Sequence, residues 1–140
     1  MAKPKPLDPV LPFCYFAAHK REMLDCMREI RHDAGIRHFA LILNDNSLRY
    51  NGAPDDSMYV EIGDIIAEVK AELAGEDFTV SWWNVNTLRA GPDASYTPVT
   101  GLNGGVSPIA YCPLDPDFRA AFIRRNAEVA KRARPHMILI

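Results

Sequence analysis

The sequence predicts an α/β fold built on a parallel sheet. Short apolar runs alternate with amphipathic helical patterns in the order β-α-β-α-β-α-β. The composition suits one globular domain, since the chain has 140 residues, of which 48% are hydrophobic and 24% are charged. Strands that alternate with helices are joined by crossover connections, so we expect them to run parallel, with their carboxyl ends at one edge of the sheet.

The first unit begins after a proline-rich segment. Residues 1–12 contain four prolines and predict an extended arm. The run "FCYFAA" at 13–18 predicts a strand that is buried on both faces. A helix follows, in which Met23, Cys26, Met27 and Ile30 form one apolar stripe, and Gly35 ends it.

Two more strands follow at 36–43 ("IRHFALIL") and 78–83 ("FTVSWW"). The helix between them is indicated by apolar residues at helical spacing, and Gly75 ends it. The apolar stripe of this helix consists of Ile62, Ile65, Ile66, Val69 and Leu73.

The alternation of strand and helix patterns stops after the third strand. Residues 84–114 are rich in Gly, Pro, Ser, Thr and Asn but contain too many apolar residues for a disordered linker, so we expect an ordered loop over the carboxyl ends of the strands. Asp115 as N-cap and Pro116 at the first helical position predict where the third helix begins. The run "HMILI" at 136–140 predicts a fourth strand.

Two architectures fit this order of elements. A small doubly wound sheet needs four or five strands, whereas a (β/α)₈ barrel takes about 250 residues, of which this chain would be the first half. The sequence stops directly after the fourth strand, with no loop or helix to cover its end. We therefore expect residues 1–140 to form a single partial domain, a half (β/α)₈ barrel, with the doubly wound sheet as the alternative.

Both architectures bind ligands at the carboxyl ends of their strands. The polar and aromatic residues at these positions are the substrate-binding candidates. An indole packs against the C–H face of a sugar ring, and side-chain amides and carboxylates bind its hydroxyl groups. Adjacent tryptophans on a strand point to opposite faces, so only one of Trp82 and Trp83 lies in the core. The candidates are His19 after the first strand, Asn44 and Asp45 after the second, and Trp83, Asn84 and Asn86 at the third.

Several classes of function lack support in the sequence. A formal charge of −2 gives no general attraction to nucleic acid or to an anionic membrane surface, and no apolar run is long enough to span a bilayer. We expect no cofactor and no metal site, because nucleotide-binding and metal-binding motifs are missing and the three cysteines have no C-x-x-C spacing. His32 and His38 are interpreted as helix-end residues. With no secretory signal, a cytoplasmic location is the default.

The stretch "WWNVNTL…YCPLDPDFRAAFIRRNAEVAKRARPHMILI" resembles the front half of bacterial glycoside-hydrolase-like (β/α)₈ barrels. In those proteins a third strand ends in Trp and Asn residues, and a long loop leads into a helix that begins near a Cys-Pro pair, here Cys112 and Pro113. The resemblance implies that Trp83, Asn84 and Asn86 are sugar-subsite residues. It also implies one catalytic carboxylate at the end of the fourth strand and another on a later strand, neither of which lies in this sequence. Glycoside hydrolysis requires both carboxylates.

We therefore expect this chain to contribute part of a carbohydrate-binding cleft and to be inactive as an isolated hydrolase, with its catalytic residues unknown. Two alternatives remain open, a complete small α/β ligand-binding module and half of another sugar-converting barrel enzyme, such as an isomerase or aldolase. The expected partners are a carbohydrate or other small polar ligand and a second copy of the chain, which would pair through exposed strand edges.

Overall fold

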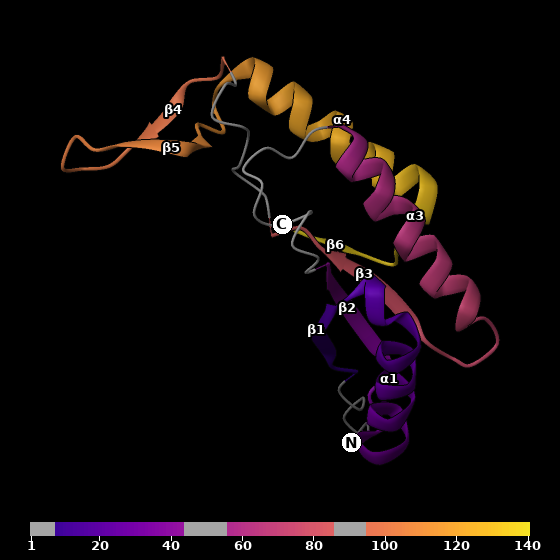
Figure 1. The fold of residues 1–140 in the computed structure, drawn as a ribbon. Coiled ribbons are helices and arrows are strands. Elements are labelled where there is room, and N and C mark those ends of the chain that lie inside the picture. Colours follow the sequence, from indigo (N-terminus) through magenta and orange to yellow (C-terminus); the bar gives the residue numbers. More distant parts are fainter. Residues whose placement is uncertain (1–7, 44–55, 86–94) are drawn as a thin grey trace, which may run out of the picture.

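The computed structural model describes residues 8–43, 56–85 and 95–140, and these residues form an α/β fold with a parallel four-stranded sheet (Figure 1). The strands are β1 (Val10–Tyr15), β2 (His38–Leu43), β3 (Thr79–Trp83) and β6 (Ile138–Leu139), in the spatial order β1-β2-β3-β6. Each neighbouring pair is parallel. The predicted α/β class is confirmed.

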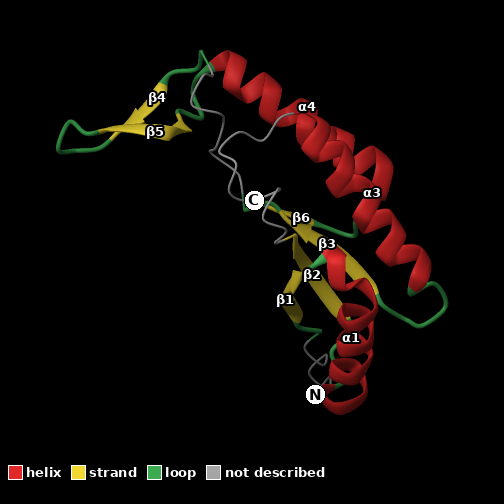
Figure 2. Ribbon diagram, in the orientation of Figure 1, coloured by secondary structure: helices red, strands yellow, loops and turns green. Residues whose placement is uncertain are grey.

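The described helices are α1 (Lys20–Ala34), α3 (Asp56–Glu72) and α4 (Pro116–Ala133), and they lie on one side of the sheet (Figure 2). One core cluster joins all of them to the same face of the strands. That face carries Leu11, Phe13 and Tyr15 of β1, Phe39, Leu41 and Leu43 of β2, and Val80 and Trp82 of β3. A doubly wound sheet reverses its strand order and carries helices on both faces, and the described part of this chain does neither.

The opposite face of the sheet, here called the open face, has no described helix packed on it (Figure 2). Pro12 and Cys14 are exposed on this face, Ile42, Trp83 and Leu139 are half-buried, and His38, Ala40 and Ser81 are buried. The expectation that the first strand is buried on both faces was therefore wrong, because β1 is an edge strand with helices on one side only. Its edge position also explains why Pro12 is tolerated within it.

The boundaries of the elements shift by a few residues from those predicted. β1 begins at Val10, inside the segment expected to be an extended arm, and the residues after it form a short 3₁₀ turn, Ala17–His19. β6 is confined to Ile138–Leu139. Edge strands are held from one side, so their ends depend on few hydrogen bonds and are hard to locate from apolar content alone.

The helix ends follow the predicted signals. Gly35 adopts a φ of 70°, and its N–H donates to the carbonyl of Arg31 at 2.9 Å. The Asp115 carboxylate caps α4 by accepting from the N–H groups of Asp117 at 3.0 Å and Phe118 at 2.9 Å. The bond from Phe118 contributes most, the bonds from Thr97, whose N–H donates to the same carboxylate at 2.7 Å, come next, and together with the Asp117 bond they lower the pKa of Asp115 to about 2.

The segment before α4 contains an antiparallel hairpin that the sequence did not predict. Its strands are β4 (Pro98–Thr100) and β5 (Val106–Tyr111), joined by a tight turn in which Gly101 N–H donates to the Gly105 carbonyl at 2.8 Å. The hairpin extends from the N-terminal end of α4, away from the four-stranded sheet (Figure 1). An aromatic cluster anchors it there, made by Tyr96, Tyr111, Phe118 and Phe122.

Candidate functional site

The carboxyl ends of the parallel strands meet at one edge of the sheet, where β1, β2, β3 and β6 end at Tyr15, Leu43, Trp83 and Leu139. Of the residues predicted to bind substrate here, His19, Trp83 and Asn84 lie within the described residues. Asn44, Asp45 and Asn86 lie outside them.

The two tryptophans of β3 point in opposite directions. Trp82 is 2% exposed and packs edge-on against Tyr59 of α3, with the ring centroids 6.2 Å apart. Trp83 lies on the open face, half-buried, in register with Leu139 of β6. The prediction that only one of the pair belongs to the core is confirmed, and Trp83 is the one whose indole is available at the strand end.

Asn84 follows Trp83 but lies on the helix-facing side of the sheet. Its side chain is buried, at 2% exposure, and its Nδ2 donates to Oδ1 of Asn126 on α4 at 3.1 Å. Asn126 in turn donates to the Phe122 carbonyl at 2.8 Å, within the same helix. The backbone N–H of Asn84 donates to the carbonyl of Leu139 at 2.8 Å. Asn84 thus ties the end of β3 to α4 and to β6 at once.

Tyr59 joins this network from α3. Burial raises the pKa of the Tyr59 hydroxyl, and its hydrogen bond with Asn84 acts in the opposite direction. The Asn84 amide therefore has partners on both helices that cover β3. A ligand-binding role for this side chain stays a prediction, and the contacts observed are those of a residue that positions the strand end beside Trp83.

His19 lies at the start of α1, on the surface. Its side chain is 65% exposed, and Nδ1 lies 3.2 Å from Oε2 of Glu22. The neighbouring Lys20 donates to Glu68 at 2.7 Å and to Glu72 at 3.0 Å, which links the start of α1 to α3. Substrate binding by His19 also stays a prediction, since the contacts recorded for its side chain are with its own helix.

A polar cluster at the amino ends of the strands was not predicted from the sequence. His38 is 6% exposed, and its Nε2 lies 2.7 Å from Oγ of Ser81, which is fully buried. The His136 ring stands edge-on to the His38 ring at 5.1 Å. The interpretation of His38 as a helix-end residue was wrong, because His38 begins β2 and its side chain is held between strands.

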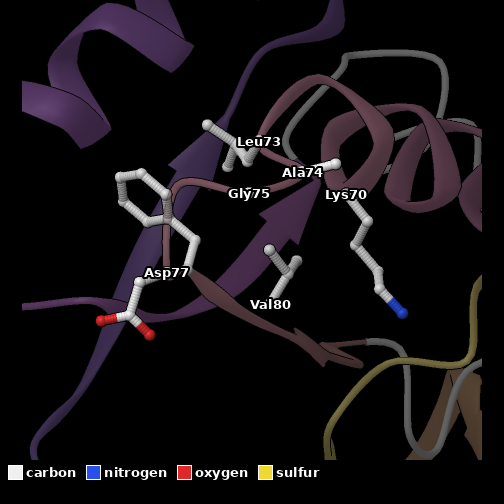
Figure 3. A pocket seen from close by; sticks show the side chains of 7 residues that line it. Lys70, Leu73, Ala74, Gly75, Asp77 and Val80 are labelled. Carbon is white, nitrogen blue, oxygen red and sulfur yellow. The ribbon is translucent and has the colours of Figure 1, made fainter.

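A cavity of about 270 Å³ lies between the end of α3 and the start of β3 (Figure 3). Its charged residues already have partners, because the Lys70 ammonium donates to the Ala133 carbonyl at 2.8 Å and the Asp77 carboxylate pairs with Arg37 at 3.1 Å. The remaining lining is mostly apolar, and the cavity opens at the amino end of β3, away from Trp83. It therefore offers little to a polar ligand.

Among the described residues, no group of three or more His, Cys, Asp or Glu side chains is placed to hold a metal ion. In the same parts of the chain, every helix is too short or too polar to cross a membrane. Comparison of the chain with models of known protein families, with curated proteins and with solved structures found no match.

Proposed function

We propose that this chain forms half of a glycoside-hydrolase-like (β/α)₈ barrel and contributes part of a carbohydrate-binding cleft, without the catalytic carboxylates. The observation that carries the proposal is the difference between the two faces of the sheet. The helix-covered face carries apolar and aromatic side chains such as Phe39, Leu41 and Trp82, whereas the open face combines Ala40, Ile42, Trp83 and Leu139 with the polar side chains of His38, Thr79 and Ser81. The described helices cover one face only.

The wall of a (β/α)₈ barrel has this arrangement. Its strands follow one another around the barrel in chain order, its helices lie outside, and its inward-facing side chains fill the interior. The order β1-β2-β3-β6, with α1, α3 and α4 on one side, supports this reading over a doubly wound sheet. On the proposed architecture the open face is the barrel interior, and Ala40, Ile42 and Leu139 belong to its packed layers.

Trp83 is the central residue of the proposed cleft. Its indole is at the carboxyl end of β3 on the open face, the end of a parallel barrel at which substrates bind. An indole offers an apolar plane to the C–H face of a pyranose ring, and the amides and carboxylate of Asn86, Asn44 and Asp45 come directly after the ends of β3 and β2 in the sequence. Those side chains suit the hydroxyl groups of a neutral sugar.

The sheet edges at β1 and β6 have no strand beside them among the described residues. Backbone groups on such edges pair readily with another strand. We propose that two copies of this chain pair through these edges, β6 of one beside β1 of the other, when no further strands are present. Light scattering during size-exclusion chromatography tests the pairing, and a mass of one chain at all concentrations contradicts it.

Isothermal calorimetry with a panel of neutral mono- and oligosaccharides tests the cleft. We expect Trp83→Ala to weaken binding about twofold to tenfold, because a stacked aromatic plane contributes roughly 0.5 to 1.5 kcal/mol beyond the area that it buries. Trp83→Phe keeps an aromatic plane and is expected to retain most of the affinity. Ile123→Ala on α4 is the matched control, since Ile123 is an exposed apolar side chain on the helix layer. Equal affinities for Trp83→Ala and wild type contradict the proposal.

A further inference from the structure

The buried polar cluster at the amino end of the sheet joins three strands. His38 belongs to β2, Ser81 to β3, and His136 lies just before β6. The His38 Nε2 and the Ser81 Oγ are 2.7 Å apart, and the rings of His38 and His136 meet at 86° with their centroids 5.1 Å apart. The two imidazoles are thus in contact at the amino end of the sheet, where His38 is nearly inaccessible to water and His136 is exposed.

The described segments that pack against this contact contribute the following groups. The segment before β1 contributes Asp8, whose carboxylate is shared with Arg37 at 3.5 Å. β3 contributes the neutral hydroxyl of Ser81, and the segment before β6 contributes His136. Burial lowers the pKa of His38, the His136 ring lowers it further, and Asp8 acts in the opposite direction. His38 is therefore neutral at pH 7.

The strand next to this contact is short. β6 has two residues and lies at the edge of the described sheet, where β3 is its neighbour. His136 N–H donates to the Val80 carbonyl at 2.9 Å, and the N–H groups of Trp82 and Asn84 donate to the carbonyls of Met137 and Leu139 at 3.0 and 2.8 Å. On the side of α4, the Lys70 ammonium donates to the carbonyls of Ala133 and Arg134.

We propose that the contact between His38 and His136 is an acid-sensitive joint that holds β6 against β3 and releases it when both imidazoles are protonated. Histidine is the side chain that gains its charge between pH 8 and pH 5. Two imidazolium rings at this separation, with one of them buried, repel each other and resist desolvation. β6 is the shortest strand of the four-stranded sheet and lies at its edge, so we expect it to separate first.

The joint does not depend on the proposed carbohydrate function, but it acts on the same edge of the sheet. Leu139 is the register partner of Trp83, so the release of β6 removes the neighbour of the Trp83 indole. Acidification would then weaken any ligand bound at Trp83, whereas the release itself is measurable without a ligand.

Amide hydrogen exchange, measured residue by residue by NMR, tests the joint. The amides of Trp82 and Asn84 are the reporters, because they donate to carbonyls of the β6 segment. The amide of Thr79 is the internal control, because it donates to the Arg37 carbonyl beside β2, at 2.9 Å. Between pH 7.5 and pH 5.5 we expect the protection factors of Trp82 and Asn84 to fall by about tenfold or more, after correction for intrinsic exchange rates. The protection factor of Thr79 is expected to stay constant.

His136→Phe keeps a ring beside His38 but removes the second charge. In this variant the protection factors of the Trp82 and Asn84 amides should therefore lose their dependence on pH. His136→Gln provides the same test should the larger ring disturb the fold. His32→Ala is the matched control, because the His32 side chain is 88% exposed and pairs with Asp33 on the surface. It should retain the full pH response. The proposal is overturned by constant protection in the wild type, by an equal loss at Thr79, or by an unchanged response in both His136 variants.

Discussion

The role of Asn84 can be decided by a double-mutant cycle with Asn126. Replacing Asn84 with Ala removes the amide that donates to Asn126 Oδ1 and the hydrogen bond to Tyr59, a residue that is 1% exposed. A buried polar group left without its partner costs about 1 to 3 kcal/mol, so we expect Asn84→Ala to lower the free energy of unfolding by about 2 to 3 kcal/mol. Asn126→Ala should cost about 1 to 2 kcal/mol, because Asn126 is only half-buried.

Urea denaturation followed by tryptophan fluorescence measures these changes. A single domain of this length is expected to unfold in one step, and with an m-value of about 2 kcal/mol per molar urea the Asn84→Ala midpoint should fall by about 1 M. The double variant should be more stable than the sum of the single losses predicts, by about 1 kcal/mol, since the two side chains share one bond. If Asn84→Ala unfolds within about 0.5 kcal/mol of the wild type and still weakens sugar binding, then Asn84 is a ligand-binding residue and the positioning role is wrong.

Three other substitutions or conditions test the packing. The pKa of Asp115 is about 2 in the folded chain, below its ordinary value of 3.8. The Asp115 carboxylate therefore stabilises the fold above pH 4, and this stabilisation is lost as the pH falls toward 2. Thermal melts should show the loss for the wild type and not for Asp115→Ala. Gly63→Ala should lower the free energy of unfolding by about 1 to 3 kcal/mol despite the higher helix propensity of alanine, because the new Cβ would lie 2.9 Å from Cβ of Arg132; a stabilised variant contradicts the close packing of α3 on α4. Trp82→Ala should cost about 3 to 5 kcal/mol and Trp83→Ala clearly less, because Trp82 alone is in the core; equal urea midpoints for the two variants contradict that assignment.

The helices were predictable because their signals are local. The apolar stripe of α1 and the left-handed Gly35 lie within one helix and its end, and the Asp115 carboxylate caps the next turn of its own chain. The parallel order of the strands followed from their alternation with helices. The single covered face did not follow, since a run such as "FALIL" at 39–43 places apolar residues on both sides of a strand.

The missed features depend on contacts between residues far apart in the sequence. Ser81 is 43 positions from His38, and Asn126 is 42 positions from Asn84, so no local pattern pairs them. The hairpin of β4 and β5 was missed for another reason. β4 has three residues, and the two strands contain Pro98 and Pro108 and show no strict alternation of apolar and polar residues. Only the glycine-rich "GLNGG" turn between them was visible as a signal.

On the proposed function, the open face at the end of β3 binds a neutral carbohydrate through Trp83. The two adjacent indoles allow a direct measurement, because their Nε1–H signals can be followed separately in ¹H–¹⁵N NMR spectra during a titration with neutral oligosaccharides. If carbohydrate binds at Trp83, the chemical shift of the Trp83 Nε1–H signal should change and reach saturation. The signal of Trp82, which lies in the core, should not shift. A Trp83 signal that does not move with any sugar at millimolar concentration, or that moves only together with Trp82, would contradict the account.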